Sequence, residues 1–197
     1  MTASRPRAYL AGPEVFLADK AEVFAAKAAL CERYGIEPAP PMDAGTLIPE
    51  GRPSRKIYLR NIHLMDGADL IIANLSPFHG PSADVGTVFE LGYGFARGLP
   101  VFGYTNDPRG FTERVEEFVG PIRIGEDGQK YGRDGRSIED FGLADNLMID
   151  ETLEDFGGVF RPSGSEPIAL SDLSVFERCL AHAAMHMARA TRHGRAG

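Results

Sequence analysis

Short apolar runs alternate with segments of helical periodicity over the first hundred residues. The runs Ala8–Ala11 and Asp69–Leu75 are typical of strands buried on both faces, and Pro100–Tyr104 predicts a further strand. Between them, apolar residues recur three and four positions apart in three segments, Asp19–Tyr34, Ser54–Met65 and Val85–Arg97. Because strands and helices alternate, the pattern predicts an α/β fold with a doubly wound parallel sheet.

The remaining segments give less regular signals. Gly35–Pro41 contains three prolines, so we expect a short strand at an edge of the sheet, where a missing backbone donor is tolerated. Residues 105–140 are rich in Gly, Asp, Arg and Glu and predict a helix followed by a polar hairpin or long loop. Phe141–Ile149 is predicted to be a short helix or loop, and Leu170–Ala190 a final amphipathic helix with a frayed tail at 191–197. We expect one domain of 197 residues.

Charge and cysteine content exclude several classes of function. The net charge is −7, which provides no basic surface for a phosphate backbone, so nucleic acid is not an expected partner. Cys31 and Cys179 lie far apart and lack metal-ligand spacing, so we expect neither a disulfide framework nor a structural metal site. The N-terminal segment does not have the pattern of a signal peptide, and no run approaches the roughly 20 apolar residues of a membrane helix. A cytoplasmic protein is the expectation.

Candidate chemistry follows the strands, because ligands of open parallel sheets bind beyond the carboxyl ends of the strands. Three loops should meet there, namely Gly12–Glu14, Ser76–Ala83 and the segment after Tyr104. The second loop leads to Asp84 and Glu90, near the start of a helix whose dipole would keep both carboxylates ionised. Two interpretations are open: both serve a ligand site, or the first caps the helix and the second is a solvated helix residue.

Two other motifs carry less weight. Gly92–Gly98 superficially resembles a dinucleotide-binding glycine motif, but it falls inside a predicted helix rather than between a strand and a helix, and the motif is therefore rejected. His182 and His186 are one helical turn apart, yet no third ligand is evident, so a packed or exposed helix explains them better than zinc does.

Four blocks resemble, in order, the signature blocks of the nucleoside 2-deoxyribosyltransferase family, and they extend over residues 8–150. They are Tyr9–Phe16, Asp69–Phe78, Asp84–Tyr93 and Asp145–Met148. The resemblance implies a flavodoxin-like five-stranded sheet, no cofactor, and a homo-oligomer that is a dimer or an assembly of dimers. It also implies nucleosides and free nucleobases as substrates, in purine and pyrimidine salvage.

The resemblance also suggests roles for individual residues. Glu90 aligns with the family's glutamate nucleophile, Tyr9 with the tyrosine that orients it, and Asp84 with the aspartate that contacts a sugar hydroxyl. Asn146 and Met148 align with residues that complete the site of a neighbouring subunit.

Further substrate-binding candidates are Gly12 in the first loop and two aromatic residues, Phe16 and Phe78, which either wall the site against water or belong to the core. Asn61 stands where many members carry an aspartate that exchanges a proton with the nucleobase. An amide cannot give up a proton at neutral pH, so Asp43 is the suggested substitute.

Three functions are compared. The first is transfer of a 2-deoxyribosyl group between nucleobases, with retention through a covalent intermediate on Glu90. The second is hydrolysis of nucleosides or of nucleoside 5′-monophosphates, the latter as in relatives that carry serines in place of Asp84 and Asn146. A carboxylate at Asp84 repels a phosphate, so free nucleosides are the predicted substrates. The third is a non-catalytic nucleotide- or metabolite-binding module.

Overall fold

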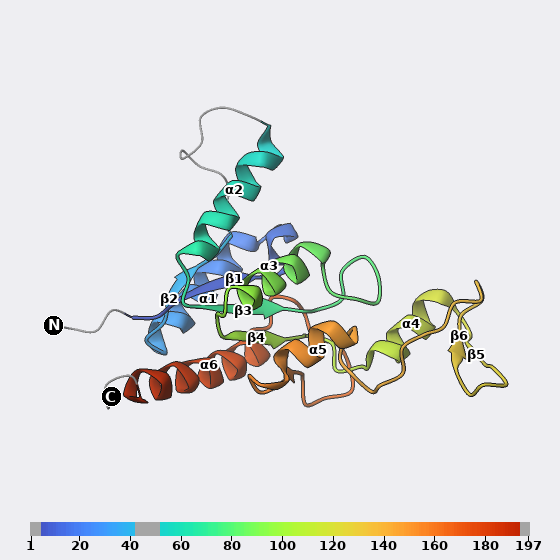
Figure 1. Ribbon diagram of the computed structural model, residues 1–197. Helices are drawn as coiled ribbons and strands as arrows, with labels where there is room; N and C mark the ends of the chain where they lie inside the picture. Colours follow the sequence, from blue (N-terminus) through green and yellow to red (C-terminus); the bar gives the residue numbers. More distant parts are fainter. Residues whose placement is uncertain (1–4, 42–51, 194–197) are drawn as a thin grey trace.

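Five parallel strands form one sheet at the centre of the molecule (Figure 1). The computed structural model describes residues 5–41 and 52–193. From edge to edge the strand order is β2-β1-β3-β4-β7, which is the flavodoxin-like order. The strands are β1 (Arg7–Ala11), β2 (Glu37–Ala39), β3 (Leu70–Asn74), β4 (Val101–Tyr104) and β7 (Val159–Phe160). The predicted fold is confirmed, and the proline-rich strand β2 lies at an edge.

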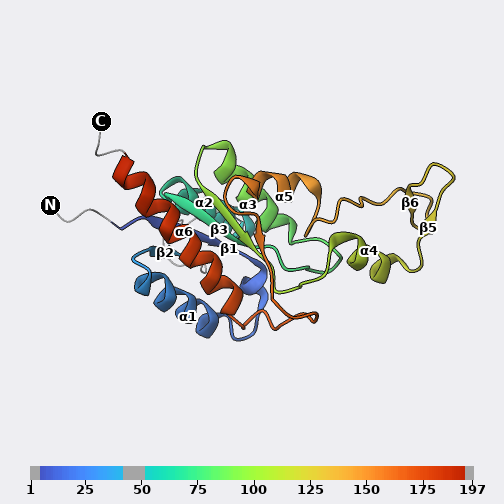
Figure 2. The same ribbon diagram turned by 90° about the horizontal axis from the view of Figure 1, so that it is seen from below.

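Helices cover both faces of the sheet (Figures 1 and 2). They are the 3₁₀ turn η1 (Pro13–Phe16) and the helices α1 (Lys20–Arg33), α2 (Pro53–Asp66), α3 (Val85–Ala96), α4 (Phe111–Val119), α5 (Leu147–Glu154) and α6 (Ser174–His193). Side chains of β1 alternate between the faces, so Leu10 packs with α1 and α6, whereas Tyr9 packs with α2, α3 and α5. This alternation places the Tyr9 phenol on the same face as Glu90.

Three elements differ from the sequence prediction. Helix α5 begins at Leu147, where Asn146 caps it, and continues to Glu154, so most of the segment predicted as Phe141–Ile149 precedes it. Strand β7 was not predicted. Helix α6 extends to His193, three residues beyond the predicted end of the helix at Ala190.

A projecting arm follows strand β4. Helix α4 and an antiparallel hairpin of β5 (Arg123–Ile124) and β6 (Lys130–Tyr131) extend away from the sheet, as Figure 2 shows. The arm confirms the helix and polar hairpin predicted for residues 105–140.

Helix α6 packs its histidines against aromatic side chains. His182 and His186 contact Phe102, with ring centroids 6.0 and 5.5 Å apart. Of the two alternatives, packed or exposed, the structure shows the packed one for both histidines. Of the helices in the described ranges, none is long and apolar enough to cross a membrane.

Helix α3 lies unusually close to the sheet at Gly94. A Cβ atom on Gly94 would come within 2.3 Å of Ile71 Cγ1 on strand β3, so only glycine fits at this contact. Gly94 is one helical turn after Glu90 and on the same helix face. The close packing therefore fixes how far the Glu90 carboxylate stands from strand β1.

Candidate active site

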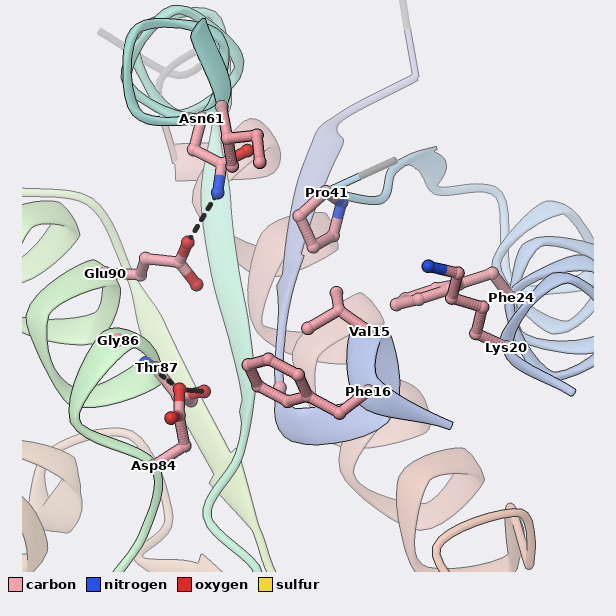
Figure 3. Close-up of a pocket in the computed structure, with 12 residues that line it drawn as sticks. Val15, Phe16, Lys20, Phe24, Pro41, Asn61, Asp84, Gly86, Thr87 and Glu90 are labelled. Atoms are coloured by element: carbon pink, nitrogen blue, oxygen red, sulfur yellow. Dashed lines mark hydrogen bonds between the residues drawn. The ribbon is translucent and has the colours of Figure 1, made fainter. Parts of the chain in front are cut away.

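A cavity of about 350 Å³ opens beyond the carboxyl end of β1, a volume within the usual range of small-ligand sites. Its walls come from the loop after β1, from α1 and α2, and from the first two turns of α3 (Figure 3). Of the predicted site residues, five line it: Gly12, Phe16, Asn61, Asp84 and Glu90. The structure thus brings together residues that lie up to 78 positions apart in the chain.

The Glu90 carboxylate is held by two hydrogen bonds and points into this cavity (Figure 3). The Tyr9 hydroxyl donates to Oε1 at 2.6 Å, and Asn61 Nδ2 donates to the same oxygen at 3.1 Å. Among the described residues, both donors use Oε1, so Oε2 is the oxygen available to a ligand. A carboxylate oriented through one oxygen and open at the other is suited to nucleophilic attack.

Burial makes Glu90 a weaker acid than an ordinary glutamate. Loss of solvent raises the pKa of Glu90 to about 7, although the hydrogen bonds from Tyr9 and Asn61 oppose the rise and the charge of Asp84 adds to it. Burial, followed by the charge of Glu90, also raises the pKa of Tyr9, which therefore remains a proton donor. The helix dipole therefore does not hold the pKa of Glu90 low as predicted, because desolvation outweighs a dipole that acts mainly in the first turn.

Asp84 both caps helix α3 and lines the cavity. Its Oδ2 accepts hydrogen bonds from the Thr87 backbone N at 2.9 Å and from Thr87 Oγ1 at 3.0 Å. The two interpretations of Asp84 are therefore compatible. The solvated-helix interpretation of Glu90 is wrong, because its carboxylate is partly buried and hydrogen-bonded.

The two candidate aromatic residues form a stack at the rim of the cavity. Phe16 lines the cavity and is 63% exposed, which excludes the core interpretation for this residue. Phe78 packs behind it with ring centroids 4.7 Å apart and an interplanar angle of 21°. Phe78 thus supports the wall without being one of the residues that line it.

Two candidates lie elsewhere. Asn146 caps α5 by accepting from Met148 N at 3.0 Å, and it donates to Glu139. Met148 is 71% exposed and lies with Val85 in a shallow apolar depression between α3 and α5. Neither lines the cavity of its own chain. Asp43 falls outside the described residues.

A buried charged cluster beneath the first loop was missed. The Glu14 carboxylate forms an ion pair with Lys27 and accepts hydrogen bonds from Asn74 Nδ2 and the Tyr104 hydroxyl, each at 2.9 Å. Burial alone would raise the pKa of Glu14, but Lys27 and Asn74 hold it below the ordinary value. A Cβ on Gly12 would collide with Glu14 Oε2, so the cluster and the cavity-lining glycine are packed as one unit. The sequence signal that could have revealed this cluster was Lys27, a charged residue on the apolar stripe of α1, three residues after Phe24.

A second missed network joins the loop before α3 to the start of α5. The Asp145 carboxylate accepts hydrogen bonds from Ser82, Ala83 N and Asn146 N, and forms a buried ion pair with Arg114 at 3.3 Å. This network fixes the cap of α5 relative to the segment that carries Asp84. The sequence signal for this network was the position of Asp145 at the start of the Asp145–Met148 block, directly before Asn146.

Comparisons with known proteins identify the family of the chain. Residues 8–148 match the family model described as nucleoside 2-deoxyribosyltransferase. The chain belongs to the nucleoside 2-deoxyribosyltransferase family. An uncharacterized protein of Schizosaccharomyces pombe is 32% identical over 167 residues, which cover 78% of this chain and 79% of that protein. The solved structure of a 2-desoxiribosyltransferase from Leishmania mexicana is similar with a TM-score of 0.63 at 28% identity, covering 92% of this chain and 98% of the other.

Proposed function

We propose that the protein transfers the 2-deoxyribosyl group between nucleobases of free 2′-deoxynucleosides, with Glu90 as the nucleophile. The observation that carries the proposal is the Glu90 carboxylate, held on Oε1 by Tyr9 and Asn61 and directed into the cavity. Family membership gives this arrangement its chemical interpretation.

In the first half-reaction, an electron pair of Glu90 Oε2 bonds to C1′ while the C1′–N bond breaks and the nucleobase keeps the bonding pair. In the second half-reaction, a nitrogen of the incoming base attacks C1′ and releases the Glu90 carboxylate, so two inversions give retention. The stacked rings of Phe16 and Phe78 shield the intermediate from water, which favours transfer over hydrolysis.

The experiment mixes thymidine or 2′-deoxyinosine with a different free base and follows the products by chromatography. A new nucleoside indicates transfer, whereas free sugar alone would establish hydrolysis instead. Glu90→Ala should reduce exchange by more than about 100-fold, because it removes the group that forms the intermediate. Glu116→Ala, on the exposed face of α4, is the matched control and should exchange at the wild-type rate. A Glu90→Ala variant with full exchange would contradict the proposal.

Hydrolysis of 5′-monophosphates is the competing function, and Asp84 argues against it. Its carboxylate lines the cavity and would repel a phosphate but accept a hydrogen bond from a sugar hydroxyl. We therefore expect kcat/KM for thymidine to exceed that for its 5′-monophosphate. The reverse order would contradict the assignment of free nucleosides as substrates.

We also propose that a second copy of the chain covers the apolar face between α3 and α5. Val85 and Met148 are 85% and 71% exposed there, and Phe95 is 50% exposed. Such a surface is typical of an interface between subunits. In this arrangement Asn146 and Met148 would complete the site of the neighbour. Val85→Asp should convert the oligomer to monomers in light scattering and reduce exchange; an unchanged mass would contradict the placement of this interface.

A further inference from the structure

Lys20 lines the wall of the cavity opposite Glu90. Figure 3 shows its ammonium group pointing into the cavity from α1, while Glu90 approaches from α3 and Asn61 from α2. Among the described residues that line this cavity, Lys20 is the only cationic one, and it faces two carboxylates, Asp84 and Glu90. The cavity therefore has an anionic side next to the nucleophile and a cationic group across from it.

The position of Lys20 in its helix is unfavourable by local rules. It is the first residue of α1, where a positive charge opposes the helix dipole. The N-cap residue, Asp19, makes no side-chain capping hydrogen bond, and Glu22 in the first turn offsets the lysine charge in part. A residue that is disfavoured locally and directed into a cavity is more readily explained by a function than by stability.

The reaction needs a proton donor toward the nucleobase, and Asn61, the described candidate for that position, does not supply one. A nucleobase that leaves with the bonding electron pair carries a negative charge unless it is protonated. Asn61 cannot release a proton, and its Nδ2 already donates to Glu90. A lysine ammonium has three donors and no acceptor, so it complements a ring nitrogen or carbonyl oxygen of a departing base.

On the basis of the proposed function, we propose that Lys20 is the catalytic acid and base that acts on the nucleobase. As Glu90 Oε2 bonds to C1′, the leaving base takes the electron pair of the C1′–N bond and a proton from Lys20 Nζ. In the second half-reaction the incoming base loses its N–H proton to the neutral Lys20 amine and bonds to C1′. The enzyme thus returns to its initial protonation state, and no other reactant is required.

The test uses leaving groups that differ in their need for a proton. Base release is measured as kcat/KM for two pairs of nucleosides. The first pair is 2′-deoxyguanosine and 7-methyl-2′-deoxyguanosine; the methylated nucleoside has the good leaving group, because its cationic base leaves as a neutral molecule. The second pair is 2′-deoxyuridine and its 5-fluoro derivative, whose base is the better leaving group. Lys20→Met keeps the apolar stem and removes the donor. It should lose about 10- to 100-fold with the poor leaving group of each pair and clearly less with the good one. Lys20→Arg retains a charged donor and should recover part of the loss.

Lys130→Met, in the hairpin of the arm, is the matched control and should behave as wild type with every substrate. Melting curves show whether Lys20→Met is folded. Equal losses for both leaving groups of a pair, or no loss at all, would overturn the role of Lys20 while leaving the proposed function intact. A wild-type protein that releases no base from any of the four nucleosides would overturn the proposed function, and the role of Lys20 with it.

Discussion

Replacing Glu90 by glutamine should stabilise the protein above neutral pH and abolish transfer. Burial raises the pKa of Glu90 from an ordinary value of 4.5 to about 7, so the folded state disfavours the ionised carboxylate. The neutral Glu90 carboxyl makes its full contribution to the free energy of unfolding below about pH 4.5, and this contribution is lost as the pH rises from about 4.5 through about 7. Glutamine stays neutral, and its Oε1 can still accept from Tyr9 and Asn61, so the variant avoids this loss.

The magnitude follows from the rise in pKa. An increase from 4.5 to about 7 corresponds to about 3 kcal/mol of unfolding free energy at high pH. Glu90 is only partly buried, so solvent screening reduces the expected effect to about 1–2 kcal/mol between pH 5 and pH 8. For a chain of 197 residues this equals a rise in melting temperature of about 3–6 °C at pH 8.

Urea unfolding of wild type and Glu90→Gln at both pH values measures the effect. The difference in unfolding free energy should be small at pH 5 and should favour the variant at pH 8. Glu116→Gln, an exposed substitution of the same kind on α4, should show no such pH dependence. If Glu90→Gln changes stability equally at both pH values, or is the less stable protein at pH 8, the assignment of Glu90 as a destabilised buried carboxylate is wrong.

Three further outcomes are expected. In a pH profile, kcat/KM for deoxyribosyl exchange should rise with pH and level off above about 7, because Glu90 attacks only when ionised; a flat profile from pH 5.5 to 8 would argue against it. Tyr9→Phe removes a hydrogen bond that lowers the pKa of Glu90, so this pH profile should move to higher pH and the exchange rate at pH 7 should fall about tenfold or more. The Tyr93 hydroxyl bonds the exposed Asp66 instead, so the control variant Tyr93→Phe should match wild type. Lys27→Met should lower the free energy of unfolding in urea by about 3–5 kcal/mol, because it leaves the buried Glu14 carboxylate unpaired, and adding Glu14→Gln should restore most of it.

The fold was largely predictable because buried parallel strands leave continuous apolar runs. Leu70–Asn74 is buried at every position, and its run of Leu, Ile and Ala is visible in the sequence. Strand β7 has only two residues, Val159 and Phe160, between a glycine pair and an Arg-Pro pair, and it joins the sheet by pairing with β4. A segment of two residues is too short to show a hydrophobic period. It forms a strand because it pairs with β4, and that contact cannot be read from the neighbouring sequence.

The candidate site was less predictable from residue patterns. Periodicity placed Glu90 on a helix, but its hydrogen bond to Tyr9 joins residues 81 positions apart, and family resemblance supplied that pairing. The protonation behaviour of Glu90 was predicted wrongly because burial depends on the packing of α2, α3 and β1 together. The Glu14–Lys27 cluster was missed for the same reason, since each residue alone is typical of a solvated surface.

The contact between Gly94 and Ile71 limits how this protein can be made more robust. Helix propensity alone favours alanine over glycine inside a helix by about 1 kcal/mol, so Gly94→Ala would rank high among stabilising substitutions. The added methyl group would instead meet Ile71 and push α3 away from the sheet. Because Tyr9 is anchored in the sheet and Glu90 on the helix, their 2.6 Å contact would be the first to lengthen. The absence of one methyl group therefore sets the alignment of the nucleophile, and thermostability engineering should leave this position untouched.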